Sequence, residues 1–213
     1  MTKYISLLQL KGGSGKTTIS INLTGFLLSK KKKVLAVDAD LPQATFSAWC
    51  ALYKNPKLEY ATARNIDELL AVLEQAQGQF DYVVIDSPPR MAEMMNAIMY
   101  ISDLVLLPVA PSAPEIWAMG DMFEVIKDAL KARDKQLNLR IVWNKFKGTK
   151  KENQTRQEVL DVYGYPEIPV PINTYVAYNE VTGQGTHVIE YTHDKAKAQF
   201  ESFGKEVLKA LKG

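Results

Sequence analysis

Five short apolar runs recur along the chain, and none of them alternates with polar residues. They are ISLLQL, VLAVD, YVVID, LVLLPV and LRIVWN. Runs of this length that are rich in β-branched residues predict strands buried on both faces of a sheet. The segments between them, such as 19–28, 66–73 and 116–130, carry apolar residues at helical spacing, and Asn65 with Glu68 predicts a cap for the second segment. This rhythm predicts an α/β fold, a mostly parallel sheet of about seven strands with helices on both faces.

The first apolar run leads into the loop KGGSGKTT, in which three glycines precede a lysine and two threonines. Because glycine has no Cβ, the backbone of such a loop can curl and direct several N–H groups toward phosphate oxygens. Lys16 adds a positive charge for β- and γ-phosphates, and the hydroxyl of Thr17 lies where such loops hold Mg²⁺. The sequence therefore predicts a phosphate-binding loop. Its expected ligand-binding residues are Lys11, Gly12, Gly13, Ser14, Gly15, Lys16, Thr17 and Thr18.

The loop departs from the common pattern G-x-x-x-x-G-K-[ST], because Leu10 stands where that pattern has a glycine and Lys11 stands at the front. In this it resembles the deviant Walker A ATPases of the ParA/MinD family, most closely the short plasmid-type ParA proteins. The resemblance implies one P-loop NTPase domain over residues 1–213 that binds ATP or ADP with Mg²⁺. It also implies that Lys11 crosses a dimer interface to phosphates bound by the partner subunit, so that Lys11 and Lys16 both serve catalysis.

Carboxylates end two of the apolar runs, at the edge where parallel sheets bind their ligands. By the resemblance, Asp38 lies near Mg²⁺ and its waters, and Asp40 orients or activates the attacking water. A pair of loop caps is the plainer alternative for these two residues. The family usually continues D-x-D-P-Q, whereas this chain inserts Leu41 before Pro42. Asp86, followed by a serine and two prolines, resembles a Walker B aspartate that binds Mg²⁺ through water.

Further candidates for the site follow the later apolar runs. Asn144 stands where this superfamily commonly recognises adenine with an asparagine side chain, since an amide offers both a donor and an acceptor. Pro171 and Ile172 are expected to cover the base. The stretch 104–119 resembles small plasmid-partition ATPases in its prolines and in Trp117, which is expected to pack on the following helix or in the core.

The net charge and the number of cysteines limit which partners, cellular compartments and metal clusters the sequence is compatible with. The net charge of +2 is too small to indicate a nucleic-acid binder, so any DNA affinity must come from local lysine clusters. Such clusters occur at 30–33, at 145–151 and along the last predicted helix, at Lys195, Lys197, Lys205, Lys209 and Lys212. The single Cys50 can form no internal disulfide, which is typical of a reducing cytoplasm. It also argues against an iron protein whose subunits each supply two cysteine ligands to a shared cluster.

The resemblance leads to a functional hypothesis, a cytoplasmic, nucleoid-associated ATPase that drives partition or positioning of plasmid or chromosomal cargo. It is expected to form a homodimer on ATP, to bind DNA non-specifically, and to hydrolyse ATP when a small ParB-like centromere- or cargo-binding protein stimulates it. About ten residues precede the loop, too few for the helix-turn-helix of longer ParA proteins. Three alternatives stay open: a MinD-like membrane-cycling ATPase, although a membrane partner is not expected, a positioner of carboxysomes or chemoreceptor clusters, and a P-loop metabolic synthetase, against which Lys11 argues.

Overall fold

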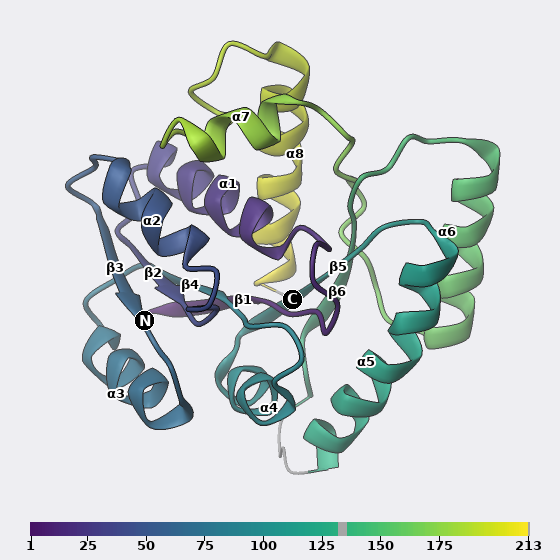
Figure 1. Ribbon diagram of the computed structural model, residues 1–213, viewed down its shortest axis with the longest axis horizontal. Coiled ribbons are helices and arrows are strands. Elements are labelled where there is room, and N and C mark those ends of the chain that lie inside the picture. The colour runs from purple at the N-terminus through teal and green to yellow at the C-terminus, as the bar shows by residue number, and fades with distance from the viewer. Residues whose placement is uncertain (132–135, 213) are drawn as a thin grey trace.

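A parallel sheet of six strands forms the centre of the computed structural model, which describes residues 1–131 and 136–212 (Figure 1). The strands are β1 (Lys3–Leu7), β2 (Val34–Asp38), β3 (Leu58–Thr62), β4 (Tyr82–Asp86), β5 (Leu104–Val109) and β6 (Leu139–Trp143). Their spatial order is β3-β2-β4-β1-β5-β6, and every neighbouring pair is parallel. The predicted fold class is therefore confirmed.

The described sheet has six strands where about seven were predicted. The segment after α6 runs beside β6 and forms two isolated bridges, Ile141 with Glu167 and Phe146 with Asn173, rather than a continuous strand. Pro169 and Pro171 lie between those bridges and have no N–H to donate, so this segment does not continue as a regular strand.

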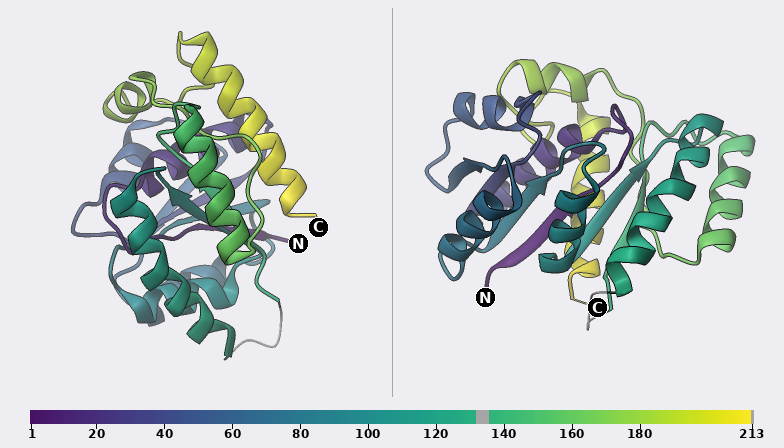
Figure 2. Two further views of the ribbon diagram at one scale, coloured as in Figure 1. Left: turned by 90° about the vertical axis from the view of Figure 1, so that its right-hand side faces the viewer. Right: turned by 60° about the horizontal axis from the view of Figure 1, so that its bottom comes forward.

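Eight helices of the described chain cover the sheet. They are α1 (Lys16–Ser29), α2 (Thr45–Leu52), α3 (Ile66–Ala76), α4 (Ala92–Ile101), α5 (Ala113–Lys131), α6 (Lys150–Tyr163), α7 (Ala177–Gly183) and α8 (Asp194–Ala210). α1, α2, α7 and α8 pack on one face and α3, α4 and α5 on the other, while α6 lies outermost beside α5 (Figures 1 and 2). None of the helices in residues 1–131 and 136–212 has the length and apolar character to cross a membrane.

The two faces of the sheet have separate cores, which explains why the apolar runs do not alternate with polar residues. In β5, Leu104 and Leu106 belong to the core under α1 and α8, while Val105 and Leu107 belong to the core above α4 and α5. Successive side chains of a strand point to opposite faces, so a strand covered on both sides needs apolar residues throughout.

The N-terminus of α3 is capped by the polar side chain that the sequence predicts. The Oδ1 of Asn65 accepts a hydrogen bond from the backbone N–H of Glu68 at 2.9 Å, which confirms the predicted cap of α3. The side chain of Glu68 in turn accepts from the backbone N–H of Arg64 at 2.8 Å. The first contact satisfies an N–H group that the first turn of the helix leaves unpaired, and the second holds the residue that precedes the cap.

The contact between α8 and α1 leaves no room for a methyl group at Gly204. A Cβ on this residue would lie 2.5 Å from the ring of Phe26, which is fully buried. Gly204→Ala should therefore lower the free energy of unfolding by about 1–3 kcal/mol through overpacking. Alanine's higher helix propensity, about 1 kcal/mol, should offset only part of that loss and leave a net decrease of up to about 2 kcal/mol. Denaturant unfolding measures the change.

Gly120→Ala is the matched control, because Gly120 also lies inside a helix but a Cβ there would meet nothing within 4 Å. This variant should gain up to about 1 kcal/mol from helix propensity alone. Equal effects of the two substitutions would contradict the packing argument.

Candidate nucleotide-binding site

The glycine-rich loop joins β1 to α1 at the carboxyl edge of the sheet. Its backbone needs glycine at two positions, because Gly13 and Gly15 have φ angles of 76° and 99° in the left-handed region. Gly15 also packs against a neighbouring loop, where a Cβ would lie 2.0 Å from the Nδ2 of Asn144. The first turn of α1 follows directly, so its unpaired N–H groups and positive dipole end lie at the loop.

A cavity of about 550 Å³ lies over this loop. Eight of the predicted site residues line it: Gly12, Gly13, Gly15, Lys16, Thr17, Thr18, Asp40 and Asn144. Lys16 is buried there, and its Nζ donates to the backbone oxygen of Gln9 at 3.2 Å. Burial lowers the pKa of Lys16, while the carboxylates of Asp86 and Asp40 oppose that shift. The structure thus brings the loop, its lysine and the three predicted carboxylates together, since Asp38 is in register with Asp86 and its Oδ1 accepts from the backbone N–H of Asp40.

Asp86 accepts hydrogen bonds from two hydroxyl groups of α1. Thr17 Oγ1 donates to Asp86 Oδ2 at 2.6 Å, and Ser20 Oγ donates to Asp86 Oδ1 at 3.1 Å. Burial raises the pKa of Asp86 to about 7, although the hydrogen bond from Thr17 opposes the shift, and the charge of Asp38 raises the pKa further. A carboxylate beside a hydroxyl offers the hard oxygen donors that Mg²⁺ prefers. Two buried hydroxyls nearby, those of Ser14 and Ser87, have no hydrogen-bond partner in the described chain, as fits a site completed by a ligand and its waters.

The carboxylate of Asp38 organises the loop between β2 and α2. Its Oδ1 accepts from the backbone N–H of Asp40 at 3.0 Å, and its Oδ2 accepts from the backbone N–H of Ser47 at 2.8 Å. Asp38 therefore acts as a loop cap in this structure, and its place near Mg²⁺ stays a prediction. The loop containing the inserted Leu41 turns back on itself, since the N–H groups of Gln43 and Ala44 both donate to the backbone oxygen of Asp40.

Asp40 itself faces the cavity. Burial raises the pKa of its carboxyl group, the positive charge of Lys16 lowers it, and the charge of Asp38 raises it. Its carboxyl group and the ammonium group of Lys16 border the same cavity, and Asp40 can hold a water molecule there by hydrogen bonding.

Of the three residues predicted to bind adenine, only Asn144 lines the cavity. Asn144 is buried at the cavity, and its Nδ2 donates to the backbone oxygen of Ser14 at 2.7 Å, so it braces the loop. Pro171 and Ile172 lie outside the cavity wall. The backbone N–H of Ile172 donates to the oxygen of Trp143 at 2.7 Å, and this pairing places the Ile172 side chain in the core.

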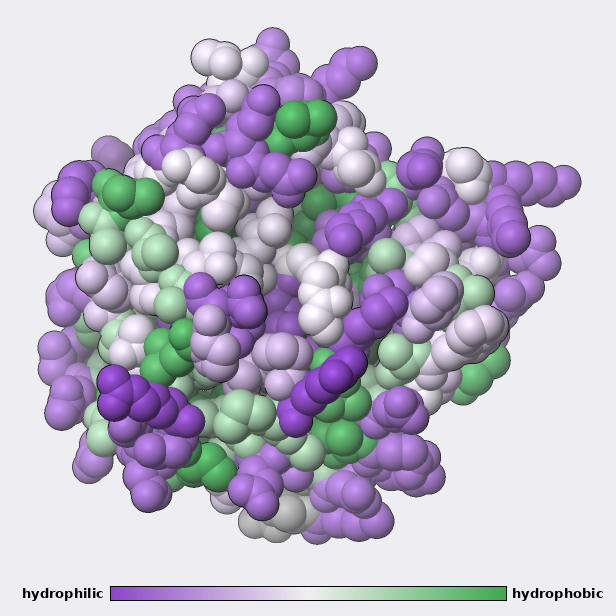
Figure 3. Space-filling view, in the orientation of Figure 1, coloured by the Kyte–Doolittle hydropathy of each residue, from purple (hydrophilic) through white to green (hydrophobic). Residues whose placement is uncertain are grey.

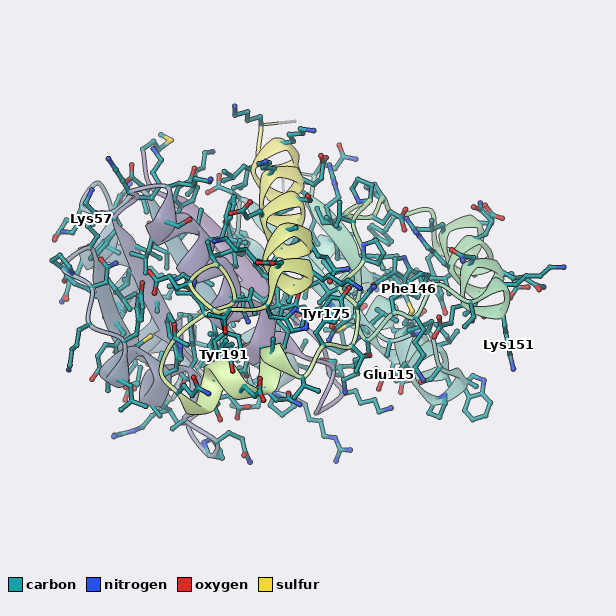
Figure 4. All side chains as sticks on the ribbon, turned by 90° about the horizontal axis from the view of Figure 1, so that it is seen from above. Lys57, Glu115, Phe146, Lys151, Tyr175 and Tyr191 are labelled. Carbon is teal, nitrogen blue, oxygen red and sulfur yellow. The ribbon has the colours of Figure 1, made fainter. Side chains whose placement is uncertain are left out.

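The residues that follow Ile172 form this wall instead, and the sequence interpretation missed them. They are Asn173, Thr174, Tyr175, Tyr178 and Asn179. Tyr175 and Tyr178 lie with ring centroids 6.2 Å apart, and Figure 4 shows Tyr175 beside α8. The polar and aromatic text NTYVAYN could have marked this segment, because aromatic faces and amides are suited to a purine base.

Lys11 points away from the cavity, which its neighbours Gly12 and Gly13 line. Its Nζ lies 2.6 Å from the Oε1 of Glu115 in the first turn of α5. Figure 4 shows Glu115 on the α5 side of the molecule, apart from Tyr175. Trp117, expected to be packed on a helix or in the core, is instead 76% exposed on this helix. The two lysines of the loop therefore occupy different environments, one inside the site and one outside it.

The buried carboxylate of Asp86 should reduce the stability of the ligand-free protein. Its native pKa of about 7 exceeds the ordinary value of 3.8, so above pH 7 the charge is disfavoured by roughly 4 kcal/mol. Asp86→Asn removes that charge but loses one hydrogen bond to a carboxylate, about 1.5–3 kcal/mol. We expect the free energy of unfolding of Asp86→Asn to exceed that of the parent by about 1–2 kcal/mol at pH 8, and this difference should shrink as the pH falls from 7 toward 4. The variant should also bind Mg²⁺ more weakly.

Urea unfolding at pH 8 and pH 5 measures this difference. Asp121→Asn is the control, because Asp121 is exposed on α5 and should give no comparable gain at either pH. An Asp86→Asn protein that is less stable than the parent at pH 8 would contradict the assignment of a strained carboxylate.

Comparisons with known proteins agree with this geometry. Residues 5–187 match the family profile described as the CobQ/CobB/MinD/ParA nucleotide binding domain. The chain is 29% identical over 189 residues to the "Maintenance of carboxysome distribution protein A" of Halothiobacillus neapolitanus, with 87% of this chain and 86% of that protein covered.

Solved structures share the fold. Apo McdA from Cyanothece aligns with a TM-score of 0.78 and 21% identity over 97% of this chain and 100% of that chain. Cobyrinic acid a,c-diamide synthase from Mycobacterium smegmatis, solved with an ATP analogue and magnesium, aligns with a TM-score of 0.78 and 18% identity over 100% of this chain and 96% of that chain. The motif, the site geometry and the family match lead to one conclusion: this chain belongs to the CobQ/CobB/MinD/ParA family of nucleotide-binding proteins and has its P-loop ATPase fold.

Proposed function

We propose that this chain is a ParA-type positioning ATPase. It binds ATP with Mg²⁺, forms a homodimer on ATP, holds DNA without sequence preference, and releases it after hydrolysis stimulated by a small ParB-like centromere- or cargo-binding protein. The observation that carries this proposal is the placement of Lys11, which lies outside its own subunit's cavity while Lys16 lies inside. A loop lysine that does not face its own nucleotide site is available to a second subunit.

The chain's own residues supply the parts that phosphoryl transfer needs. The loop N–H groups and Lys16 would hold the β- and γ-phosphates, and Thr17 with Asp86 would hold Mg²⁺, which would neutralise charge on the phosphates. Asp40, at the cavity wall, positions the attacking water. Phosphoryl transfer depends mainly on positioning and charge neutralisation, so this set is sufficient for slow hydrolysis. A lysine from the partner subunit adds charge where the transition state develops it.

The cargo has a second candidate, a carboxysome. The named relative at 29% identity is a carboxysome distribution protein, and the match covers most of both chains. The same cycle of dimerisation, DNA binding and hydrolysis serves plasmid, chromosomal or carboxysome cargo. A synthetase is less well supported although one shares the fold, because a lysine directed out of the site has no role in a reaction confined to one subunit.

DNA is favoured over a membrane as the surface to which the dimer binds. The apolar side chains of α8 are used within the fold, since Phe200, Phe203 and Val207 are buried in the core with α1. The outer face of α8 carries exposed lysines, among them Lys195 and Lys205. Hydrophilic side chains also cover α6 in Figure 3, and the exposed lysines of this helix are Lys150 and Lys151.

Lys11→Ala is the central test of this proposal. ATP binding by the monomer should stay within about twofold of the parent, because Lys11 makes no contact with the cavity, and ATP-dependent dimerisation should be lost. Hydrolysis should fall by roughly a thousandfold or more, as when a transition-state cation supplied in trans is removed. Light scattering after gel filtration measures the dimer, and a fluorescent ATP analogue measures affinity. Lys16→Ala should instead lose nucleotide binding.

Normal ATP-dependent dimerisation of Lys11→Ala would overturn the dimer proposal. Loss of nucleotide affinity in this variant would place Lys11 in its own subunit's site.

Lys205→Ala tests the DNA surface. A dimer presents each lysine twice, so its removal should weaken ATP-dependent DNA binding on every sequence and leave dimerisation unchanged. The slope of log affinity against log salt should become shallower by about 0.9 for each DNA phosphate that the variant no longer neutralises. Fluorescence anisotropy on two unrelated duplexes at several salt concentrations measures both effects.

Lys57→Ala is the matched control, because it removes the same charge from a lysine that lies far from α8 (Figure 4). If Lys205→Ala binds DNA as the parent does, the lysines of the 145–151 segment are the next candidates. Binding of the parent to liposomes and not to DNA would favour a membrane-cycling ATPase instead.

A further inference from the structure

The ion pair between Lys11 and Glu115 is less exposed than the two pairs formed within α5, Lys127 with Glu124 and Lys131 with Asp128. The Glu115 side chain is 10% exposed and that of Lys11 is 35% exposed, and their charged atoms lie 2.6 Å apart. By contrast, the side chains of Lys127 and Glu124 in α5 are 70% and 74% exposed. Exposed pairs of that kind contribute little, whereas removing one partner of a desolvated pair leaves a poorly compensated charge.

Lys11 is the one ion-pair partner of Glu115 within residues 1–131 and 136–212. The second carboxylate oxygen, Oε2, is buried and has no hydrogen-bond partner in the described structure. If Lys11 moves away, no other ion pair in the described chain replaces it, and the charge of Glu115 is offset only in part by the N-terminal end of α5. The contact resists opening more than an exposed pair would, because opening it leaves a nearly buried carboxylate alone.

This contact conflicts with the task proposed for Lys11. One ammonium group cannot pair with Glu115 of its own subunit at 2.6 Å and also reach phosphates across a dimer interface. The subunit therefore has two alternatives, a resting state in which Lys11 is paired with Glu115 and an engaged state in which Lys11 is free for the partner. A contact that stabilises the resting state lowers the fraction of subunits ready to dimerise.

We propose that Glu115 is a positioning residue that holds Lys11 in the resting subunit and sets the ATP concentration at which the dimer forms. The inference rests on the proposed function, because it assumes that Lys11 acts in trans. In the dimer, the phosphates bound by the partner subunit replace Glu115 as the anionic partner of Lys11. ATP bound across the interface therefore competes directly with Glu115 for this lysine. Without that competing charge the lysine stays paired with its own α5.

Glu115→Gln tests this inference, because it keeps the size of the side chain and removes its charge. The ATP concentration that gives half-maximal dimerisation should fall about fivefold or more, which is the lower end of the coupling usual between two states. The affinity of the monomer for ATP, measured at protein concentrations too low for dimerisation, should stay unchanged. Glu115→Asp keeps the charge on a shorter side chain and should need an ATP concentration between those of Glu115→Gln and the parent.

Two further variants separate positioning from a structural role. Asp121→Asn removes the same charge from an exposed position of α5 and should dimerise as the parent does. Lys11→Ala combined with Glu115→Gln should dimerise no better than Lys11→Ala alone, because Glu115 acts through Lys11. Recovery of dimerisation in the double variant would overturn the inference.

The outcomes also distinguish this inference from the proposed function. If the parent protein fails to dimerise at any ATP concentration, the proposed function is wrong and this inference is wrong with it. If the parent dimerises and neither Glu115→Gln nor Glu115→Asp lowers the ATP requirement, only the role of Glu115 is overturned. Should Glu115→Gln fail to fold, the shorter carboxylate of Glu115→Asp decides the question.

Discussion

Parallel pairing of β1 with β4 on one side and β5 on the other fixes the position of the glycine-rich loop, and the rest of the site depends on it. The chain leaves β1 at the point where the strand order changes direction, which is where open α/β sheets bind ligands. Because Leu7 is in register with Asp86, the loop begins at the level of that carboxylate. The register of two strands thus brings the hydroxyl of Thr17 within 2.6 Å of Asp86.

That placement concentrates charge where water is excluded. Lys16, Asp38 and Asp86 are all buried, and the opposed charges of Lys16 and Asp86 only partly offset the burial of each. A fold without a ligand would be more stable with apolar groups of the same size at these positions. The arrangement is consistent with a protein that gains stability when an anionic nucleotide and a divalent cation bind, since such ligands supply the missing partners.

The sequence predicted those parts of the fold whose signal is local. Strands covered on both faces were found because apolar residues dominate each run and do not alternate with polar ones, whereas β3, with the sequence LEYAT, was missed because it is a half-exposed edge strand. In the site, the loop and Asp86 were predicted from motifs that occupy a few adjacent residues. The cavity wall at Tyr175 and Tyr178 was not, because its position depends on how the segment before α7 packs against α8. The pairing of Lys11 with Glu115 joins residues 104 positions apart, beyond any local pattern.

The fold by itself does not decide between chemistry on a small substrate and movement of a cargo, because a synthetase and a positioning protein align with the same TM-score of 0.78. These two functions differ in the orientation of a few side chains at the carboxyl edge of the sheet. In a reaction confined to one subunit, a loop lysine that points out of the site takes no part. This loop directs Lys16 inward and Lys11 outward, and the outward lysine is held by a carboxylate that has no other ion-pair partner in the described chain. A charge kept in that way, at the rim of a nucleotide site, is suited to a contact between subunits that forms and breaks with the nucleotide.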